Sequence, residues 1–138
     1  MSAAEIKARL TSSLAQINEY FTTNNNCNID EKTQEILTTF LAQNQIIEFL
    51  NYAESTSRNN PYSKHNELIL LLYPCWSNLY DNLGVERKNT IKRLKLLKED
   101  RKADPININK LETNIKSIED KKSIALINVC KFRIMVGA

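Results

Sequence analysis

The chain has only two glycines and three prolines among its 138 residues, so it has few of the residues that form tight turns. Its apolar residues recur at steps of three and four rather than in alternation, which is the spacing of amphipathic helices. Together these features predict an all-α protein. The length suffices for one domain that buries about two-thirds of the surface exposed in the unfolded chain, so we expect a single helical domain over residues 1–138.

Cysteines are few and odd in number. Cys27, Cys75 and Cys130 lie far apart, and no two of them have the C-x-x-C spacing. This pattern favours neither a disulfide framework nor a zinc site, and it fits a reducing compartment. We therefore expect no metal and no cofactor.

Long apolar runs are also missing. The longest, residues 68–73, is far too short to span a bilayer. The first residues lack the apolar run of a secretory signal, and Ser2 stands where myristoylation requires glycine. The sequence therefore predicts a soluble, intracellular protein of the cytoplasm or the nucleus that does not bind a membrane.

Most catalytic templates are excluded by what the sequence lacks. It has one histidine, no glycine-rich phosphate loop, no G-x-S-x-G and no H-E-x-x-H. Its acidic residues are scattered on helix faces opposite the apolar stripes, where solvated charge is the usual explanation. The net charge of +3 is mild and lies below the basic footprint of a dedicated nucleic-acid-binding domain.

Residues 67–83 form the stretch around which we expect the fold to be organised. Their apolar side chains make a wide helical stripe that extends onto a second face, and the stretch holds Trp76, the only tryptophan. A helix of this kind is expected to be central and to contact several neighbours. Pro74 predicts a kink or a break in it, and Gly84 is expected to end it in the left-handed conformation.

Two helices are predicted before this stretch. The first is capped by Ser2 and has one narrow apolar stripe, and residues 22–29 follow as a polar loop that carries Cys27. Asp30 caps the second helix.

The second helix is expected to run to about Ala53 or Ser55, although Asn44 interrupts its apolar stripe. Residues 55–61 then read as a linker, because their short polar side chains compete with helical hydrogen bonds and the segment ends in proline.

A strongly basic helix is predicted over residues 86–102, which contain eight basic and three acidic side chains for a net charge of +5. One face of it carries four lysines, namely Lys88, Lys92, Lys95 and Lys102. Lysines in such a row can contact a phosphate backbone or an acidic protein, but no aromatic side chain lies between them to stack on single-stranded bases. The face is either a solvated surface or a polyanion site with weak, salt-dependent affinity for nucleic acid.

The last helix is predicted to begin at Asp104 and Pro105 and to run almost to Gly137. Its apolar residues alternate steps of three and four, as in a coiled-coil heptad. We expect it to form an antiparallel hairpin with the basic helix, in a compact bundle of about five helices. The heptad stripe is either the internal seam of this bundle or a partner-binding surface made of Ile108, Leu111, Ile115, Ile118 and Lys122.

The segment from Arg58 to His65, with Asn59 after the arginine and six residues between the two, resembles the Arg-x4–6-His motif of the all-α HEPN ribonucleases. The resemblance covers eight residues. It implies that His65 moves a proton at a 2′-hydroxyl or leaving oxygen of RNA while Arg58 holds the phosphate. Two copies of that family form one site across an interface, so it also implies a dimer. The alternative is a surface arginine and a histidine near a helix start.

Taken together, the sequence favours a non-enzymatic protein-protein interaction module, such as an adaptor or a small helical subunit of a larger assembly. Its partner would be another protein or a second copy of the chain, bound through helices. A HEPN-like ribonuclease that uses Arg58 and His65 across a dimer is the first alternative. A helical protein that binds RNA or another polyanion weakly is the second.

Overall fold

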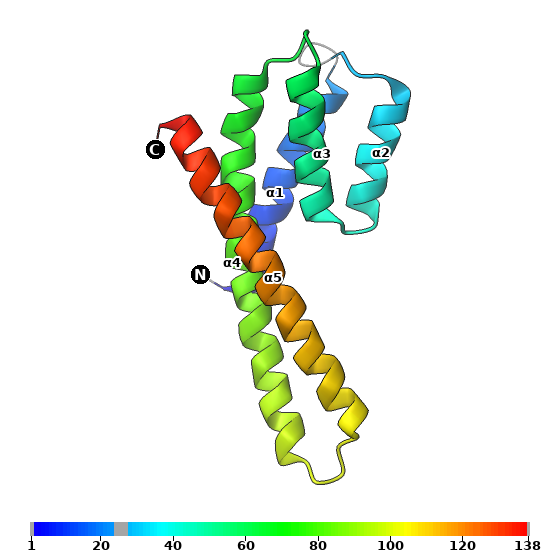
Figure 1. Cartoon of the computed structure of the whole chain (residues 1–138), viewed down its shortest axis with the longest axis vertical. Coiled ribbons are helices and arrows are strands. Elements are labelled where there is room, and N and C mark those ends of the chain that lie inside the picture. The colour runs from blue at the N-terminus through cyan, green and yellow to red at the C-terminus, as the bar shows by residue number, and fades with distance from the viewer. Residues whose placement is uncertain (1, 24–27, 138) are drawn as a thin grey trace.

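The computed structural model describes residues 2–23 and 28–137, so half of the predicted loop over residues 22–29, including Cys27, lies outside the described residues. The described residues form five helices and no strand: α1 (Ala3–Thr22), α2 (Glu31–Ala42), α3 (Ile46–Asn59), α4 (His65–Glu99) and α5 (Pro105–Val136). The two longest helices, α4 and α5, pack closely as an antiparallel hairpin (Figure 1). The all-α bundle and its C-terminal hairpin are therefore confirmed.

Several helix ends form as the local sequence signals predict. The side chains of Ser2 and Asp30 accept hydrogen bonds from backbone N–H groups in the first turns of α1 and α2. Asp104 does the same for α5, directly before Pro105. At the other end of α5, Gly137 adopts the left-handed conformation with a φ of 75°.

The prediction of one long helix after Asp30 is wrong, because the chain forms α2 and α3 there instead. Asn44 lies between them with a φ of 57°, a conformation that its short polar side chain tolerates. The N–H of Gln45 donates to the carbonyl of Phe40 at 2.8 Å and closes the turn. The chain therefore reverses, and α3 packs back against α2.

The linker predicted over residues 55–61 is also wrong for most of its length, since α3 continues to Asn59. Ser57 is buried, and its hydroxyl lies 2.5 Å from the hydroxyl of Ser63. Because this hydroxyl is paired with another side chain, it does not compete with the backbone groups of α3 for their hydrogen bonds. The connection between α3 and α4 is limited to residues 60–64.

Helix α4 continues through both residues that were expected to interrupt it. Pro74 lies inside the helix, so the predicted break does not occur. Gly84 also lies inside the helix and does not adopt the left-handed conformation, since Gly137 is the one described glycine with a positive φ. The predicted helices over residues 67–83 and 86–102 are therefore parts of one helix of 35 residues. A glycine such as Gly84 costs a helix only about 1 kcal/mol, and packing of both halves of α4 against neighbours outweighs that.

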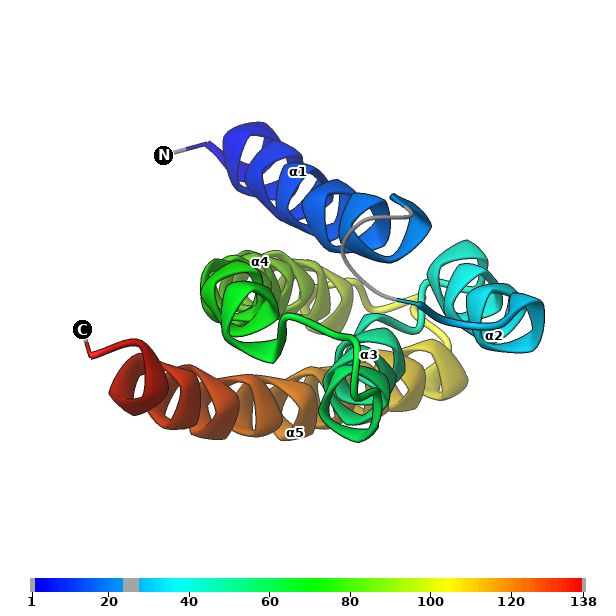
Figure 2. The ribbon, with the colours of Figure 1, turned by 90° about the horizontal axis from the view of Figure 1, so that it is seen from above.

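The centre of the fold is α4, as predicted. It lies between α1 and α5 and also contacts α3 (Figure 2). Trp76 on α4 is fully buried, and the buried cluster around it includes side chains from all five helices. The core therefore lies in the half of the molecule where α1, α2 and α3 flank the hairpin (Figure 1).

The far half of the hairpin extends past the other three helices (Figure 1). No side chain is buried over residues 91–117. Two ion pairs join the helices there, Arg87 with Glu119 at 3.0 Å and Lys98 with Glu112 at 3.4 Å. Despite the length of α4 and α5, no helix in the described ranges is long and apolar enough to cross a membrane.

Candidate functional site

The heptad stripe of α5 lies in the interface with α4. Nζ of Lys122, the polar residue of the stripe, lies 4.9 Å from the centre of the Tyr80 ring on α4, an attractive position for an ammonium group. The residues predicted as a partner surface are all buried or half-buried there: Ile108, Leu111, Ile115, Ile118 and Lys122.

A different side of α5 is exposed and apolar. We call this surface the outer face of α5. It lies in the C-terminal half of the helix, turned away from α4, and its side chains are between 41% and 81% exposed. Its surroundings carry positive charge, since residues 121–137 contain four basic and no acidic side chains, although Glu54 balances the charge of Lys131 and Lys122 lies against Tyr80 of α4. It consists of Ile124, Ile127, Ile134 and Met135, with Lys131 between the two pairs, whereas Leu126 is exposed on another side of the helix.

Sequence reasoning missed this surface because it followed a single stripe along the last helix. The signal was present in residues 124–136, where apolar side chains stand both inside and outside the heptad positions. A helix segment that is apolar on more than one side buries both sides or presents one of them to a partner. The structure buries one side and leaves the other exposed.

The predicted basic face is exposed and carries no ion pair with any described residue. Lys88, Lys92 and Lys95 lie on α4, at positions opposite the side that packs on α5. Lys102 lies past the end of α4, in the turn that leads to α5. The helical face therefore contains three of the four lysines, and the fourth lies at the tip of the hairpin.

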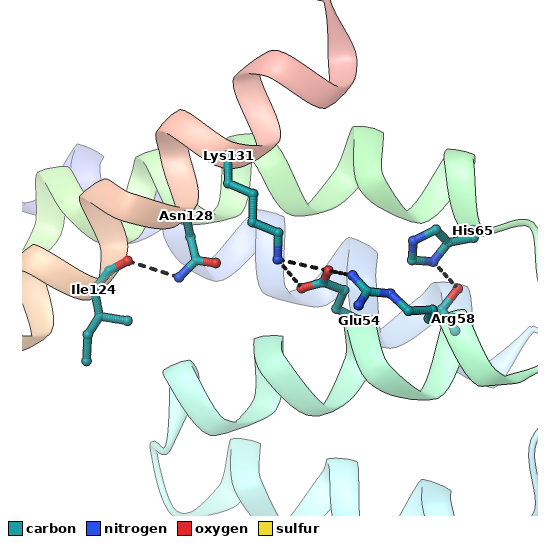
Figure 3. A network of polar contacts seen from close by, with 7 residues as sticks. Glu54, Arg58, His65, Ile124, Asn128 and Lys131 are labelled. Carbon is teal, nitrogen blue, oxygen red and sulfur yellow. Dashed lines mark hydrogen bonds and ion pairs between the residues drawn. The ribbon is translucent and has the colours of Figure 1, made fainter.

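Arg58 and His65 lie at neighbouring ends of α3 and α4 (Figure 3). The guanidinium of Arg58 points along α3 and donates a hydrogen bond to the carboxylate of Glu54 (Figure 3). Nδ1 of His65 lies 3.2 Å from the hydroxyl oxygen of Ser57. The structure thus brings the two residues near each other, and each of the two side chains has its own partner within the chain.

Glu54 is a buried carboxylate held between two cations. Its side chain is 9% exposed, and besides Arg58 it binds Lys131 of α5, whose Nζ lies 3.0 and 3.1 Å from the two carboxylate oxygens. A buried charge is tolerated where opposite charges and hydrogen bonds compensate it. The network therefore fastens α3 to the C-terminal half of α5 (Figure 3).

The two described cysteines, Cys75 and Cys130, differ in their surroundings. Cys75 lies in the core, and burial raises the pKa of its thiol to about 12, so the thiol stays protonated at neutral pH. Cys130 is exposed on α5. Within residues 2–23 and 28–137, no group of three or more histidine, cysteine or acidic side chains is placed to hold a metal ion.

Comparison with protein-family models, with curated proteins and with solved structures gives no match for this chain. Its function therefore has to be inferred from its own surfaces.

Proposed function

We propose that this protein is a non-enzymatic interaction module that binds a helical segment of a partner protein on the outer face of α5. The observation that supports the proposal is the exposure of four large apolar side chains on one face of α5, namely Ile124, Ile127, Ile134 and Met135. Proteins that act as monomers rarely leave a contiguous apolar patch in water, and such patches commonly mark interaction sites. Burying one such side chain contributes roughly 1.5–3 kcal/mol.

The charge around the outer face favours an amphipathic helix with acidic flanks as the partner. A helix with apolar residues at i, i+3, i+4 and i+7 can lay them on this face, and acidic residues beside them would meet the basic side chains of residues 121–137. A second copy of the chain would bring the same basic surroundings. Like charges would then meet, which disfavours self-association through this face.

A display library of amphipathic helical peptides tests the proposal. Half of its members carry glutamate beside the apolar stripe, and half carry lysine at the same positions. We expect the full chain to select glutamate-flanked peptides. The double variant Ile127→Ser, Ile134→Ser should bind the selected peptides at least tenfold more weakly, because it removes the two most exposed side chains of the outer face.

The matched control is the double variant Leu96→Ser, Ile106→Ser, which changes two side chains of similar exposure in the far half of the hairpin. It should bind the selected peptides as the unchanged chain does. Selection without preference for acidic flanks would contradict the proposed partner chemistry. Sedimentation that shows a dimer broken by the Ile127 and Ile134 changes would show a second copy on this face instead.

A further inference from the structure

A polar cleft of about 200 Å³ lies between α4 and α5, in a part of the hairpin separate from the outer face. Asn89 and Arg93 line it from α4, and Asn114, Ser117 and Lys121 line it from α5. All five side chains carry hydrogen-bond donors. The two helices thus present donors to one small space.

These five donor side chains make no hydrogen bond or ion pair with any described residue, although other pairs form across the same hairpin. Arg87 binds Glu119 on the core side of Arg93, and Lys98 binds Glu112 on its tip side. Except for Lys121, the donors of the cleft lie between these two ion pairs, and Glu86 is the one carboxylate that lines the cleft with them. A ligand that supplies acceptors would complete the arrangement.

The charge in the cleft is positive. Arg93 and Lys121 stand on opposite walls, and Glu86 is the one carboxylate in the lining. The hydroxyl of Thr90 donates to the backbone carbonyl of Glu86 at 2.8 Å, so its proton is already used within α4. The lining therefore favours an anion that accepts several hydrogen bonds.

We propose that this cleft binds the phosphate group of a small phosphate monoester. Such a group carries about −1.5 to −2 charges at neutral pH and has three oxygens that accept hydrogen bonds strongly. A guanidinium can bind two of these oxygens at once, as Arg93 would, and Lys121 supplies a point charge from the other wall. The two asparagine amides and the serine hydroxyl provide the remaining donors. A carboxylate has too few oxygens to use all five.

Nuclear magnetic resonance titration of the full chain tests the proposal, with glycerol phosphate as the probe and with acetate and sulfate at matched ionic strength. We expect saturable shifts of the side-chain amides of Asn89 and Asn114 with glycerol phosphate. Acetate should bind at least tenfold more weakly. Equal binding of acetate, or shifts that never saturate, would overturn the proposal. Sulfate bound as tightly as glycerol phosphate would overturn the assignment to phosphate.

Two variants show whether the cleft itself is responsible. Arg93→Ala with Lys121→Ala should weaken binding at least tenfold, whereas Lys92→Ala with Lys95→Ala removes the same charge from outside the cleft lining and should change it less than twofold. Asn114→Ala leaves the net charge unchanged and should weaken binding severalfold. All these side chains are exposed, so the fold should be kept. An equal loss in both double variants, or no loss in Asn114→Ala, would show diffuse attraction in place of a built site.

Discussion

Lys131 on α5 donates hydrogen bonds to both carboxylate oxygens of Glu54 on α3, at 3.0 and 3.1 Å, across 77 positions of sequence. The carboxylate also accepts a hydrogen bond from Arg58. The acid is buried, whereas the lysine and arginine side chains are 42% and 59% exposed. Breaking the network is therefore costly mainly because it leaves the buried carboxylate unpaired, whereas the two cations can be solvated by water.

Removing the two cations should destabilise the protein more than additively. Lys131→Met or Arg58→Met alone leaves one cation on Glu54 and should cost about 1 kcal/mol. The double variant leaves a buried, unpaired carboxylate and should cost about 3–5 kcal/mol. Urea unfolding followed by circular dichroism measures the free energies of unfolding. Glu54→Leu in the double variant should recover most of the loss, and simple additivity of the single changes would refute this account.

Gly84→Ala should stabilise the protein by about 0.5–1 kcal/mol, because glycine inside a helix is conformationally costly. A Cβ at this position would lie 3.6 Å from Nζ and 3.7 Å from Cε of Lys122, which is ordinary contact with the end of a flexible side chain. Gly137→Ala serves as the contrast, since the left-handed φ of 75° there should prevent any gain. The thermal unfolding midpoint of each variant checks this, and a lower midpoint for Gly84→Ala would show that Lys122 cannot adjust.

The sequence predicted those parts of the fold that depend on neighbours along the chain. Asp30 and Asp104 cap helices because the donors they satisfy lie two or three residues away. Asn44 and Gly84 were assigned the wrong roles, since either can sit in a helix or end one. Packing against distant residues decides between these outcomes, and one sequence does not display that packing.

The same limit applies to the candidate sites. The heptad of α5 identified the stripe that faces α4, but periodicity alone does not tell an internal seam from a binding face. The pairing of Glu54 with Lys131 has no signal in the sequence because the two residues lie on helices far apart in the chain. The exposed basic face was predicted for three of its four lysines, since Lys88, Lys92 and Lys95 lie on the side of α4 away from its apolar seam, whereas Lys102 lies past the end of the helix.

The buried thiol of Cys75 should resist alkylation, because burial both shields it and raises its pKa to about 12, which keeps the reactive thiolate scarce. In a Cys27→Ser background, iodoacetamide near neutral pH should modify one thiol of the native protein, and peptide mass spectrometry should place it on Cys130, which is exposed. Cys75 should react only after denaturation. Equal modification of both thiols in the native protein would show that the core around Cys75 opens readily.

Any binding of RNA by the basic face should be weak and should fall steeply as salt rises, because lysine contacts to phosphates release counterions. Replacing Lys88, Lys92 and Lys95 with alanine should weaken binding of a mixed-sequence RNA and reduce the slope of log affinity against log salt by about 2. Fluorescence anisotropy over a series of salt concentrations measures both. Tight, sequence-selective binding at high salt would contradict this expectation. The control removes three exposed lysines elsewhere, Lys7, Lys32 and Lys64.

The purified chain should not cleave RNA, although Arg58 and His65 resemble the HEPN ribonuclease motif. The guanidinium binds Glu54 and the imidazole lies beside Ser57, so cleavage would require both side chains to leave their partners and converge on one phosphate. Incubation with a labelled RNA and separation of the products measures this. Cleavage that persists in His65→Ala would come from a contaminant. Cleavage abolished by both His65→Ala and Arg58→Ala, with unchanged circular dichroism, would instead establish a ribonuclease and displace the interaction module as the primary function.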